Sequence, residues 1–316
     1  MQNAKLQLKI QNSKKIKKEL PSVQKNISLK NYTTFKIGGK AKYFFAAKSK
    51  ESLISAIKAA KRINLPFFML GRGSNLLVSD KEYKGLIIKI QNTKYKIPRS
   101  RTSSLRGKQN TKIYAEAGVP LSQLLNEATK NNLTGLEWAV GIPGSVGGAV
   151  KGNAGAFGSS LSDNIQRVEV FNINNEKIKI FKNKNCQFSY RNSIFKKNKS
   201  LIVVSLVLKL KKGNKKEMEK KIKEYSDYRK RHQPLNFSSA GSIFVNPEGF
   251  SAGQLIEKCG LKGKKIGEAQ ISKIHANFIV NRNRAKAKDV KKLINLMKKK
   301  VKQKFGLVLK EEIEYL

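Results

Sequence analysis

The sequence has few of the residues that build disulfide frameworks, metal clusters or membrane spans. Among its 316 residues are two cysteines, Cys186 and Cys259, and two histidines. Two cysteines make neither a disulfide framework nor a metal cluster, so we expect two free thiols in a reducing compartment. The strongest apolar run, Leu201 to Leu208, has the length of a strand and falls well short of the roughly 18 residues of a membrane helix. The first thirty residues lack the apolar core of a signal peptide. We therefore expect a cytoplasmic protein with no membrane partner.

Acidic residues are also scarce. The chain has 21 Asp and Glu against 66 Lys and Arg, a formal net charge of +45. Such a charge is typical of proteins that bind nucleic acids or anionic membranes. Most of the excess is lysine, however, whereas arginine is favoured for bidentate recognition of phosphates and bases. No recognised nucleic-acid-binding module is present. We interpret the charge as a solvated coat that can speed the capture of an anionic substrate, and expect no nucleic-acid partner.

Strand and helix patterns are mixed along the chain without a regular alternation, which favours an α+β fold with at least two domains. Residues 93–110 have the composition of a loop. Strands are predicted at 41–47, 66–70, 76–79, 85–90, 112–117, 166–171, 176–181, 201–210, 277–281 and 306–315. Helices are predicted near 53–60, 120–128, 215–231, 251–260 and 290–301.

The first of two glycine-rich segments is Gly71-Arg72-Gly73-Ser74-Asn75-Leu76, which directly follows a predicted strand. Its glycines let backbone N–H groups point at an anion, and its Ser and Asn side chains add hydrogen bonds. Leu76 stands where a dinucleotide fingerprint has its third glycine, and no helix pattern follows. The segment is therefore neither that fingerprint nor a P-loop. Alone, such a loop is more often a tight turn than a ligand site.

The second segment, residues 141–158, contains Gly141-Ile142-Pro143-Gly144-Ser145-Val146-Gly147-Gly148 and then Asn153-Ala154-Gly155. So many glycines make the chain entropically expensive to order, which a plain loop has no reason to bear. The interspersed apolar side chains are packing residues, unlike the filler of a flexible linker. We predict a backbone that wraps against a flat, phosphate-bearing cofactor, where any Cβ would collide with the ligand.

These segments and several further motifs resemble, in the same order, those of the UDP-N-acetylenolpyruvoylglucosamine reductase family. The resemblance covers about residues 30–315, and the spacing between Tyr190 and the 240s is similar to the shorter of the family's two subtypes. The further motifs are Thr33-Thr34-Phe35-Lys36-Ile37-Gly38-Gly39, Gly135-Leu136-Glu137-Trp138-Ala139, Tyr190-Arg191-Asn192-Ser193, Ala240-Gly241-Ser242-Ile243-Phe244 with Asn246-Pro247, Leu261-Lys262-Gly263 and His275-Ala276-Asn277-Phe278.

The resemblance implies an α+β fold with a two-part FAD-binding region of the vanillyl-alcohol-oxidase (PCMH) type and a C-terminal α+β substrate domain. After a basic, loosely held arm at 1–30, the expected boundaries are 31–84 and 85–214 for the FAD-binding subdomains and 215–316 for the substrate domain. The last strand of the substrate domain is expected to return to the flavin region. FAD should bind non-covalently, because neither His232 nor His275 lies in a glycine segment. The residues expected to bind it are Gly71, Arg72, Gly73, Ser74, Asn75, Leu76, Gly141, Ile142, Pro143, Gly144, Ser145, Gly147, Gly148, Asn153, Ala154 and Gly155.

The implied reaction is the NADPH-dependent reduction of UDP-N-acetylglucosamine enolpyruvate to UDP-N-acetylmuramate, a step of peptidoglycan precursor synthesis, by a monomeric enzyme. Arg191 is expected to stabilise the substrate carboxylate and Ser242 to donate a proton. Glu312, three residues after Leu309, is expected to assist at the same carboxylate, which requires burial to raise its pKa so that it is protonated or shares a proton. The adjacent Glu311 is not assigned a role.

Other polar residues receive lesser roles. Substrate contacts are expected from Tyr190, Asn246 and Lys262. His275 is interpreted as a strand-end histidine, and both Arg229 and Arg231 are expected on a solvated helix face.

The chain departs from the family pattern at Gly152, where a larger residue is common, at Val245, where Lys is common, and at Lys310, an earlier Glu position. Val245 puts one substrate or nicotinamide contact in doubt, but no departure removes a proposed catalytic group. Three alternatives stay open: another FAD-dependent oxidoreductase of the same fold, a flavoprotein with a structural role only, and a basic nucleic-acid-binding protein.

Overall fold

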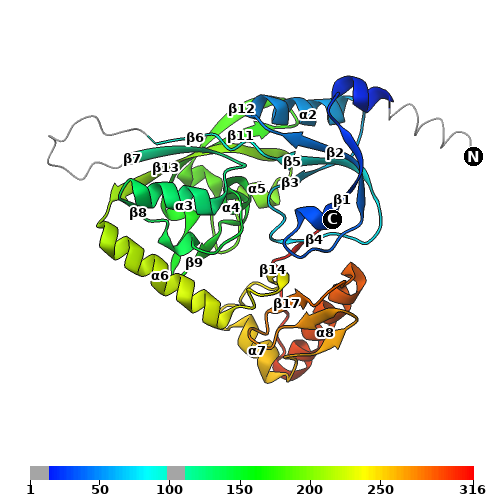
Figure 1. Ribbon diagram of the computed structural model, residues 1–316, viewed down its shortest axis with the longest axis vertical. Coiled ribbons are helices and arrows are strands. Elements are labelled where there is room, and N and C mark those ends of the chain that lie inside the picture. The colour runs from blue at the N-terminus through cyan, green and yellow to red at the C-terminus, as the bar shows by residue number, and fades with distance from the viewer. Residues whose placement is uncertain (1–13, 98–110) are drawn as a thin grey trace, which may run out of the picture. The chain divides into compact units, whose positions relative to one another are not determined.

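The computed structural model describes residues 14–97 and 111–316, which form two units that each draw on several stretches of the chain (Figure 1). Within the described residues, unit 1 contains 14–26, 42–71, 84–97 and 111–225. Unit 2 contains 27–41, 72–83 and 226–316. The units do not follow the expected boundaries at 84 and 214, because two early stretches belong with the C-terminal residues. Each unit is described by itself below.

A four-stranded sheet and one long helix form the first half of unit 1. The strand order is β1 (Gln24–Ser28), β2 (Lys40–Ala47), β5 (Tyr83–Ile90) and β3 (Phe67–Leu70), with β3 and β5 parallel. Helix α2 (Lys50–Arg62) begins with a reciprocal capping box between Ser49 and Ser52, which satisfies two backbone donors at its start. Leu53, Ile57 and Ala60 are fully buried on one face, as the helical periodicity predicts.

The N-terminal arm is the first correction to the sequence-based expectations. Residues 14–19 are helical, and Ile16 and Leu20, four positions apart on the same face, are 0% and 3% exposed in the core beneath α2. Burial of two large aliphatic side chains holds this stretch in place despite its many lysines. The arm is therefore packed from residue 14 onward, while residues 1–13 lie outside the described part of the chain.

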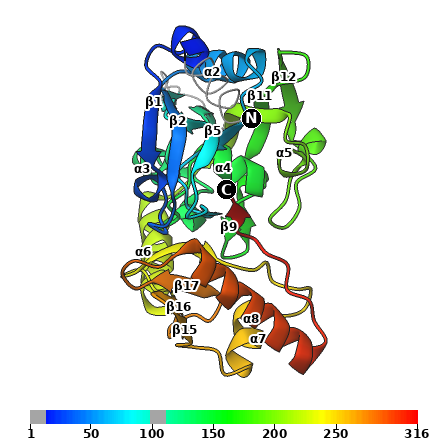
Figure 2. The ribbon, with the colours of Figure 1, turned by 90° about the vertical axis from the view of Figure 1, so that its right-hand side faces the viewer.

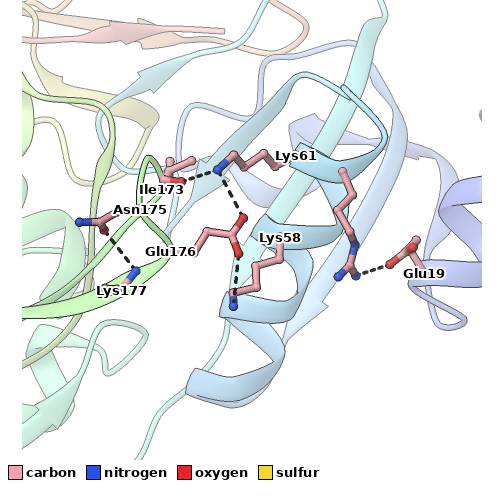
Figure 3. A network of polar contacts seen from close by, with 8 residues as sticks. Glu19, Lys58, Lys61, Ile173, Asn175, Glu176 and Lys177 are labelled. Atoms are coloured by element: carbon pink, nitrogen blue, oxygen red, sulfur yellow. Dashed lines mark hydrogen bonds and ion pairs between the residues drawn. The ribbon is translucent and has the colours of Figure 1, made fainter.

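Ion pairs fix α2 at its polar edge (Figure 3). Glu176, in the turn of a hairpin, accepts contacts from Lys58 at 3.4 Å and Lys61 at 3.3 Å, and Lys61 also donates to the carbonyl of Ile173 at 2.9 Å. Arg62 pairs with Glu19 of the N-terminal stretch. The hydrogen bond from Lys61 is the main cause of the lowered pKa of Glu176. Exposed pairs of this kind add little stability, but they determine which side of the helix meets the hairpin.

The second half of unit 1 is an antiparallel sheet with helices on it. The strand order is β12 (Lys177–Lys182), β11 (Ile165–Asn172), β13 (Leu201–Lys212), β7 (Thr111–Glu116) and β6 (Tyr95–Lys96), and β8 (Leu133–Thr134) pairs with the end of β13. Strand β6 lies inside the stretch expected to be a loop, of which residues 98–110 are outside the described part. The associated short elements are α3 (Leu121–Lys130), η2 (Glu137–Ala139), α4 (Val146–Gly152), β9 (Gly155–Ala156), β10 (Ser159–Ser160), η3 (Leu161–Asp163), η4 (Asn183–Cys186) and α5 (Ile194–Lys197).

Unit 2 is built on the sheet β14 (Ser238–Ser242), β17 (Phe278–Asn281), β16 (Ala269–Ile271) and β15 (Lys265–Ile266), with α8 (Ala287–Phe305) packed on β15 and β16 (Figure 2). Helix α6 (Lys215–His232) leads from unit 1 into it, and α7 (Ala252–Lys258) follows β14. The predicted α8 stripe is fully in the core: Val290, Leu293, Ile294, Met297 and Val301.

Hydrogen bonds between side chains and backbone groups link residues 27–41 and 72–83 to the last hundred residues, with which they form unit 2. Thr34 Oγ1 donates to the carbonyl of Ser239 at 2.7 Å, and Asn281 Nδ2 donates to the carbonyl of Phe35 at 3.0 Å. Asp80 accepts the backbone N–H of Ala287 at 3.0 Å at the start of α8. The 3-10 helix η1 (Leu29–Tyr32) also lies in this part of the unit.

The end of the chain pairs with the first glycine segment. Strand β18 (Glu314–Tyr315) runs parallel to β4 (Leu76–Leu77), and Leu316 N donates to the carbonyl of Leu77 at 3.1 Å. The predicted strand at 306–315 is thus much shorter, because Gly306 adopts a left-handed φ of 70° that ends α8 and residues 307–313 make only an isolated bridge to Phe244. In the part of the chain that is described, no helix has the length and apolar character needed to cross a bilayer.

Candidate active site

The second glycine segment contains a short helix where the sequence suggested an extended wrapping loop. Val146–Gly152 forms α4 between Ser145, an extended N-cap, and Asn153, whose φ of 42° is left-handed and ends the helix. Val146, Ala149 and Val150 are buried on its inner face. Tertiary packing of this face outweighs the low helix propensity of its three glycines.

The glycine positions of this segment exclude a side chain for different physical reasons. A Cβ at Gly147 would lie 2.8 Å from the Cβ of Ala117, and a Cβ at Gly155 would meet the carbonyl of Ser159 at 2.5 Å. These two positions exclude a side chain because protein atoms lie against them. The expectation that every Cβ would collide with a ligand is therefore wrong for Gly147 and Gly155.

Gly71, Gly148 and Ser145 border one another and fit a bound cofactor better. The Oγ of Ser145 is the atom nearest to a Cβ built at Gly71 (2.8 Å) and at Gly148 (3.6 Å). Ser145 is 3% exposed, does not use its hydroxyl to cap α4, and finds no hydrogen-bond partner for it among residues 14–97 and 111–316. A buried hydroxyl without a partner is costly, and a polar group of a ligand would satisfy it. The residues present thus fit FAD at this point.

Asn153 connects the glycine segment to the turn that carries Arg191. Its Nδ2 donates to the carbonyl of Ser189 at 3.1 Å, and its Oδ1 accepts from the N–H of Ser162 at 3.1 Å. The hydroxyl of Ser193 donates to the carbonyl of Lys151 at 2.7 Å. Since the side chain of Asn153 holds these turns together, its expected part in cofactor binding would fall to its backbone.

Tyr190 and Arg191 form the tip of that turn. Ser189 and Asn192 exchange two backbone hydrogen bonds of 3.1 Å around them, and Arg191 has a left-handed φ of 55°. The guanidinium carbon of Arg191 lies 5.4 Å from the centre of the Tyr190 ring, and Tyr190 is 59% exposed. A strained backbone at the tip of a well-anchored turn is typical of functional positions.

In unit 2, the structure brings Ser242 and Glu312 onto neighbouring backbones. Ser242 ends β14, and the carbonyl of the next residue, Ile243, accepts the N–H of Glu312 at 2.8 Å. The carbonyl of Glu312 accepts a hydrogen bond from Asn75 Nδ2 at 2.9 Å. Asn75, which the sequence assigned to the cofactor, therefore contacts the backbone of a proposed catalytic residue.

Glu311 has a separate set of partners. Lys298 Nζ lies 2.9 Å from Glu311 Oε1, and the hydroxyl of Tyr315 donates to Oε2 at 2.5 Å. Burial alone would raise the pKa of Glu311, but these two hydrogen bonds outweigh it and the pKa is lowered. Glu311 is thus an ionised structural carboxylate beside Glu312.

The expected substrate contacts of unit 2 have internal partners. Asn246 Oδ1 accepts the N–H of Ala252 at 3.0 Å, and Lys262 forms a 2.6 Å ion pair with Glu257. His275 accepts the N–H of Asn277 at its Nδ1 (3.2 Å), and its pKa is lowered by burial and then by the charge of Lys262. These contacts agree with a structural His275.

The burial of Arg229 corrects the prediction of a solvated helix face and is the feature of this helix that the sequence analysis missed. It is only 8% exposed, whereas Arg231 lies on the exposed face as expected. The signal was present in the sequence, because Met218, Ile222 and Tyr225 follow a helical spacing that Arg229 continues. Tyr225 stacks on Phe157 of the glycine segment, with ring centres 4.0 Å apart and planes 3° from parallel.

Comparison with known proteins agrees with these observations. Residues 41–181 match the family described as FAD binding domain, and residues 233–316 match the family described as UDP-N-acetylenolpyruvoylglucosamine reductase, C-terminal domain. Fold and glycine segments together define the class, an FAD-dependent oxidoreductase with an α+β fold.

Individual relatives narrow this class to one family. UDP-N-acetylenolpyruvoylglucosamine reductase of Caldanaerobacter subterraneus subsp. tengcongensis is 44% identical over 92% of this chain and 92% of its own length. The protein of the same name from Clostridium novyi is 40% identical over 92% and 91%. The crystal structure of the Thermus caldophilus enzyme has a TM-score of 0.74 and 36% identity, covering 92% of this chain and 97% of that chain. The chain belongs to the UDP-N-acetylenolpyruvoylglucosamine reductase family, which confirms the resemblance seen in the sequence.

Proposed function

We propose that this chain reduces UDP-N-acetylglucosamine enolpyruvate to UDP-N-acetylmuramate with NADPH, as a step of peptidoglycan precursor synthesis. One observation carries the proposal: in the unit that matches the family's C-terminal domain, the backbone after Ser242 bonds to Glu312 at 2.8 Å. The Ser242 hydroxyl, which can relay a proton, and the Glu312 carboxyl group therefore lie on two segments that are hydrogen-bonded to each other.

The residues that would hold FAD come from both glycine segments. In unit 1, the Ser145 hydroxyl offers an unsatisfied hydrogen-bond donor. Gly71 and Gly148, which border it, allow a ligand to approach the backbone closely. In unit 2, the turn from Arg72 to Leu76 is held by β18 and offers further backbone groups. FAD held there would supply the hydride chemistry that links NADPH to the terminal carbon of the enolpyruvyl group.

Arg191 would bind and stabilise the reacting carboxylate. As the terminal carbon gains a hydride, negative charge develops on the adjacent carbon and spreads into the carboxylate. Arginine stays charged throughout and can fork onto a carboxylate with two hydrogen bonds. Its position at the tip of an anchored turn supports this role, because the turn limits where the guanidinium can go.

Ser242 would complete the reaction by donating a proton from its hydroxyl to the carbon that carries the developing charge. Serine is a weak acid, but a carbanion-like enolate is a strong base, so a fixed hydroxyl suffices as a relay. The half-buried Glu312 would assist as a carboxyl group that is protonated or shares a proton with the same carboxylate. Hydride and proton together add across the carbon–carbon double bond, which balances the reduction.

Substrate contacts are assigned to Tyr190, Asn246 and Lys262. The exposed Tyr190 ring is accessible for stacking, while Lys262 would exchange its ion pair with Glu257 for the diphosphate. Because substrate and product are anionic nucleotide sugars, the lysine-rich surface favours their capture. We expect the enzyme to act as a cytoplasmic monomer without a nucleic-acid or membrane partner.

The absorbance spectrum of the purified protein tests the proposal. Flavin bands should be present, NADPH should bleach them, and the enolpyruvyl substrate should restore them. Ser242→Ala should keep the bleaching and slow the return by roughly 10² to 10⁴-fold, the usual contribution of a positioned proton donor. Ser239→Ala, three positions earlier on β14, is the matched control and should keep both halves.

Three results would contradict parts of this proposal. If Ser242→Ala keeps both halves at full speed, Ser242 has no catalytic role. If oxygen restores the bands while the enolpyruvyl compound does not, the protein is another oxidoreductase of this fold. A folded protein that is colourless and takes up no added FAD would overturn the proposal as a whole.

A further inference from the structure

The backbone of Glu312 is held from two sides by groups that lie far away in the sequence. On one side its N–H donates to the carbonyl of Ile243 at 2.8 Å. On the other side its carbonyl accepts from Asn75 Nδ2 at 2.9 Å. Both peptide groups of this residue are therefore engaged, which limits the directions that its side chain can take.

Asn75 makes this contact as an extension of a strand ladder. Its own carbonyl accepts the N–H of Glu314 at 3.0 Å, just before the parallel pairing of Leu76 with Glu314. The Asn75 side chain adds one more hydrogen bond to the ladder, at Glu312, which lies two residues before Glu314. The two contacts bracket Ile313, which is 4% exposed in the core of unit 2. A carboxamide can do this because its N–H mimics the backbone donor that the ladder lacks at this point.

We propose that Asn75 is a positioning residue for Glu312. This role rests on the proposed function: the Asn75 side chain orients the catalytic carboxyl group of Glu312. The first glycine segment and Glu312 are thereby aligned with each other. Asn75 is exposed, so losing the bond should loosen Glu312 without unfolding the unit. Small misplacements of reacting groups reduce rates strongly, up to about 100-fold for 1 Å.

The half-reactions of the FAD-loaded enzyme measure this role. In Asn75→Ala, return of the flavin bands on addition of the enolpyruvyl substrate should slow about 10-fold, a fraction of what full misplacement would cause. The return should slow more than the bleaching by NADPH, both measured on enzyme saturated with FAD, because the alignment of Glu312 serves the second half-reaction only. Asn75→Asp should slow the return more than Asn75→Ala, since its carboxylate would face the carbonyl of Glu312.

A matched control exists in unit 1. Asn131 is also exposed, and its Nδ2 donates to the backbone carbonyl of Glu127 at 2.8 Å at the end of α3. Asn131→Ala removes the same kind of bond and should leave both half-reactions unchanged. The double variant Asn75→Ala with Glu312→Gln should return no more slowly than Glu312→Gln alone, because two residues that act through one group are not additive.

Three results would overturn the assignment. Weaker FAD retention with a normal return would make Asn75 a cofactor contact, and additive losses in the double variant would separate it from Glu312. Hydrogen exchange decides the matter even if the wild-type protein fails to turn over the substrate and the proposed function falls. Exchange at the amides of 312–314 should rise in Asn75→Ala and not in Asn131→Ala, and unchanged exchange would refute the contact in solution.

Discussion

The two glycine segments have similar compositions but owe their glycines to different causes. Residues 141–155 contain a helix, and Gly147 is required because Ala117 lies against it. In the turn that begins at Gly71, Gly73 has a left-handed φ of 64°, and a Cβ there would run into the backbone of Tyr32. One segment is stabilised by the packing of a helix face, the other by conformation and by the strand that pairs with it. A glycine count alone does not distinguish these causes.

The most disruptive test of this comparison is Gly73→Ala. The substitution combines a left-handed backbone, unfavourable for any residue with a Cβ, with a clash against main-chain atoms of Tyr32. We expect a loss of about 3 kcal/mol in the free energy of unfolding, from strain and overpacking together. Chemical denaturation followed by circular dichroism measures it. A variant as stable as the wild type would show that the turn adopts another conformation.

Gly147→Ala should have an intermediate effect. Its backbone is ordinary, so a side chain is opposed by Ala117 alone, whose Cβ would lie at 2.8 Å and whose carbonyl oxygen would lie at 3.2 Å. We expect a loss of about 2 kcal/mol in the free energy of unfolding, typical of one added methyl group in a packed core. The paired change Ala117→Gly should recover part of this loss by removing the opposing Cβ. Failure to recover it would place the clash elsewhere.

Gly152→Ala should act in the opposite direction. No heavy atom lies within 4 Å of a Cβ built there, and the residue is in a helix. Replacing a helical glycine should raise the free energy of unfolding by about 0.5 to 1 kcal/mol. The open space also explains how a larger residue, common here in the family, would fit. A destabilised variant would mean that this helix end is tighter than the structure shows.

The smallest expected effect is a pH dependence of stability that arises in unit 2, because both histidines lie in that unit. The pKa of His275 is lowered from 6.5, so the folded state favours its neutral form. Its contribution to stability is complete above about pH 6.5 and is lost as the pH falls further, since the unfolded chain then binds more protons. His275→Asn keeps an acceptor for the Asn277 N–H without titrating, so its stability should fall less between pH 6.5 and 5. Equal pH dependence in both proteins would exclude this origin.

Local patterns in the sequence predicted much of the fold. The stripe from Val290 to Val301 and the strand at 201–210 follow from periodicity and apolar content, which depend on neighbouring residues. Helix α4 was missed because its glycines disfavour a helix until tertiary packing supports it. Arg229 was missed because a charged residue on a charged helix is usually exposed.

The division of the chain could not be predicted for a related reason. Residues 27–41 and 72–83 join unit 2 through a shared core that includes Phe35, Ile37 and Leu77 and through hydrogen bonds such as that of Thr34. No local pattern predicts these contacts. For the candidate site, the motifs identified Ser242 and Glu312, while the bond that carries Asn75 to Glu312 depends on a pairing between distant strands. Which residues share a unit is thus decided by long-range contacts.

The pairing of β18 with β4 has a consequence for the order in which the protein assembles. During synthesis, β4 emerges long before its partner β18, which follows all of unit 1 in the sequence. Unit 2 must therefore wait with an unpaired strand until β18 has been made, whereas the helices and strands of unit 1 are already complete. A chain stalled just before residue 310 should display a finished unit 1 beside an open, protease-sensitive unit 2.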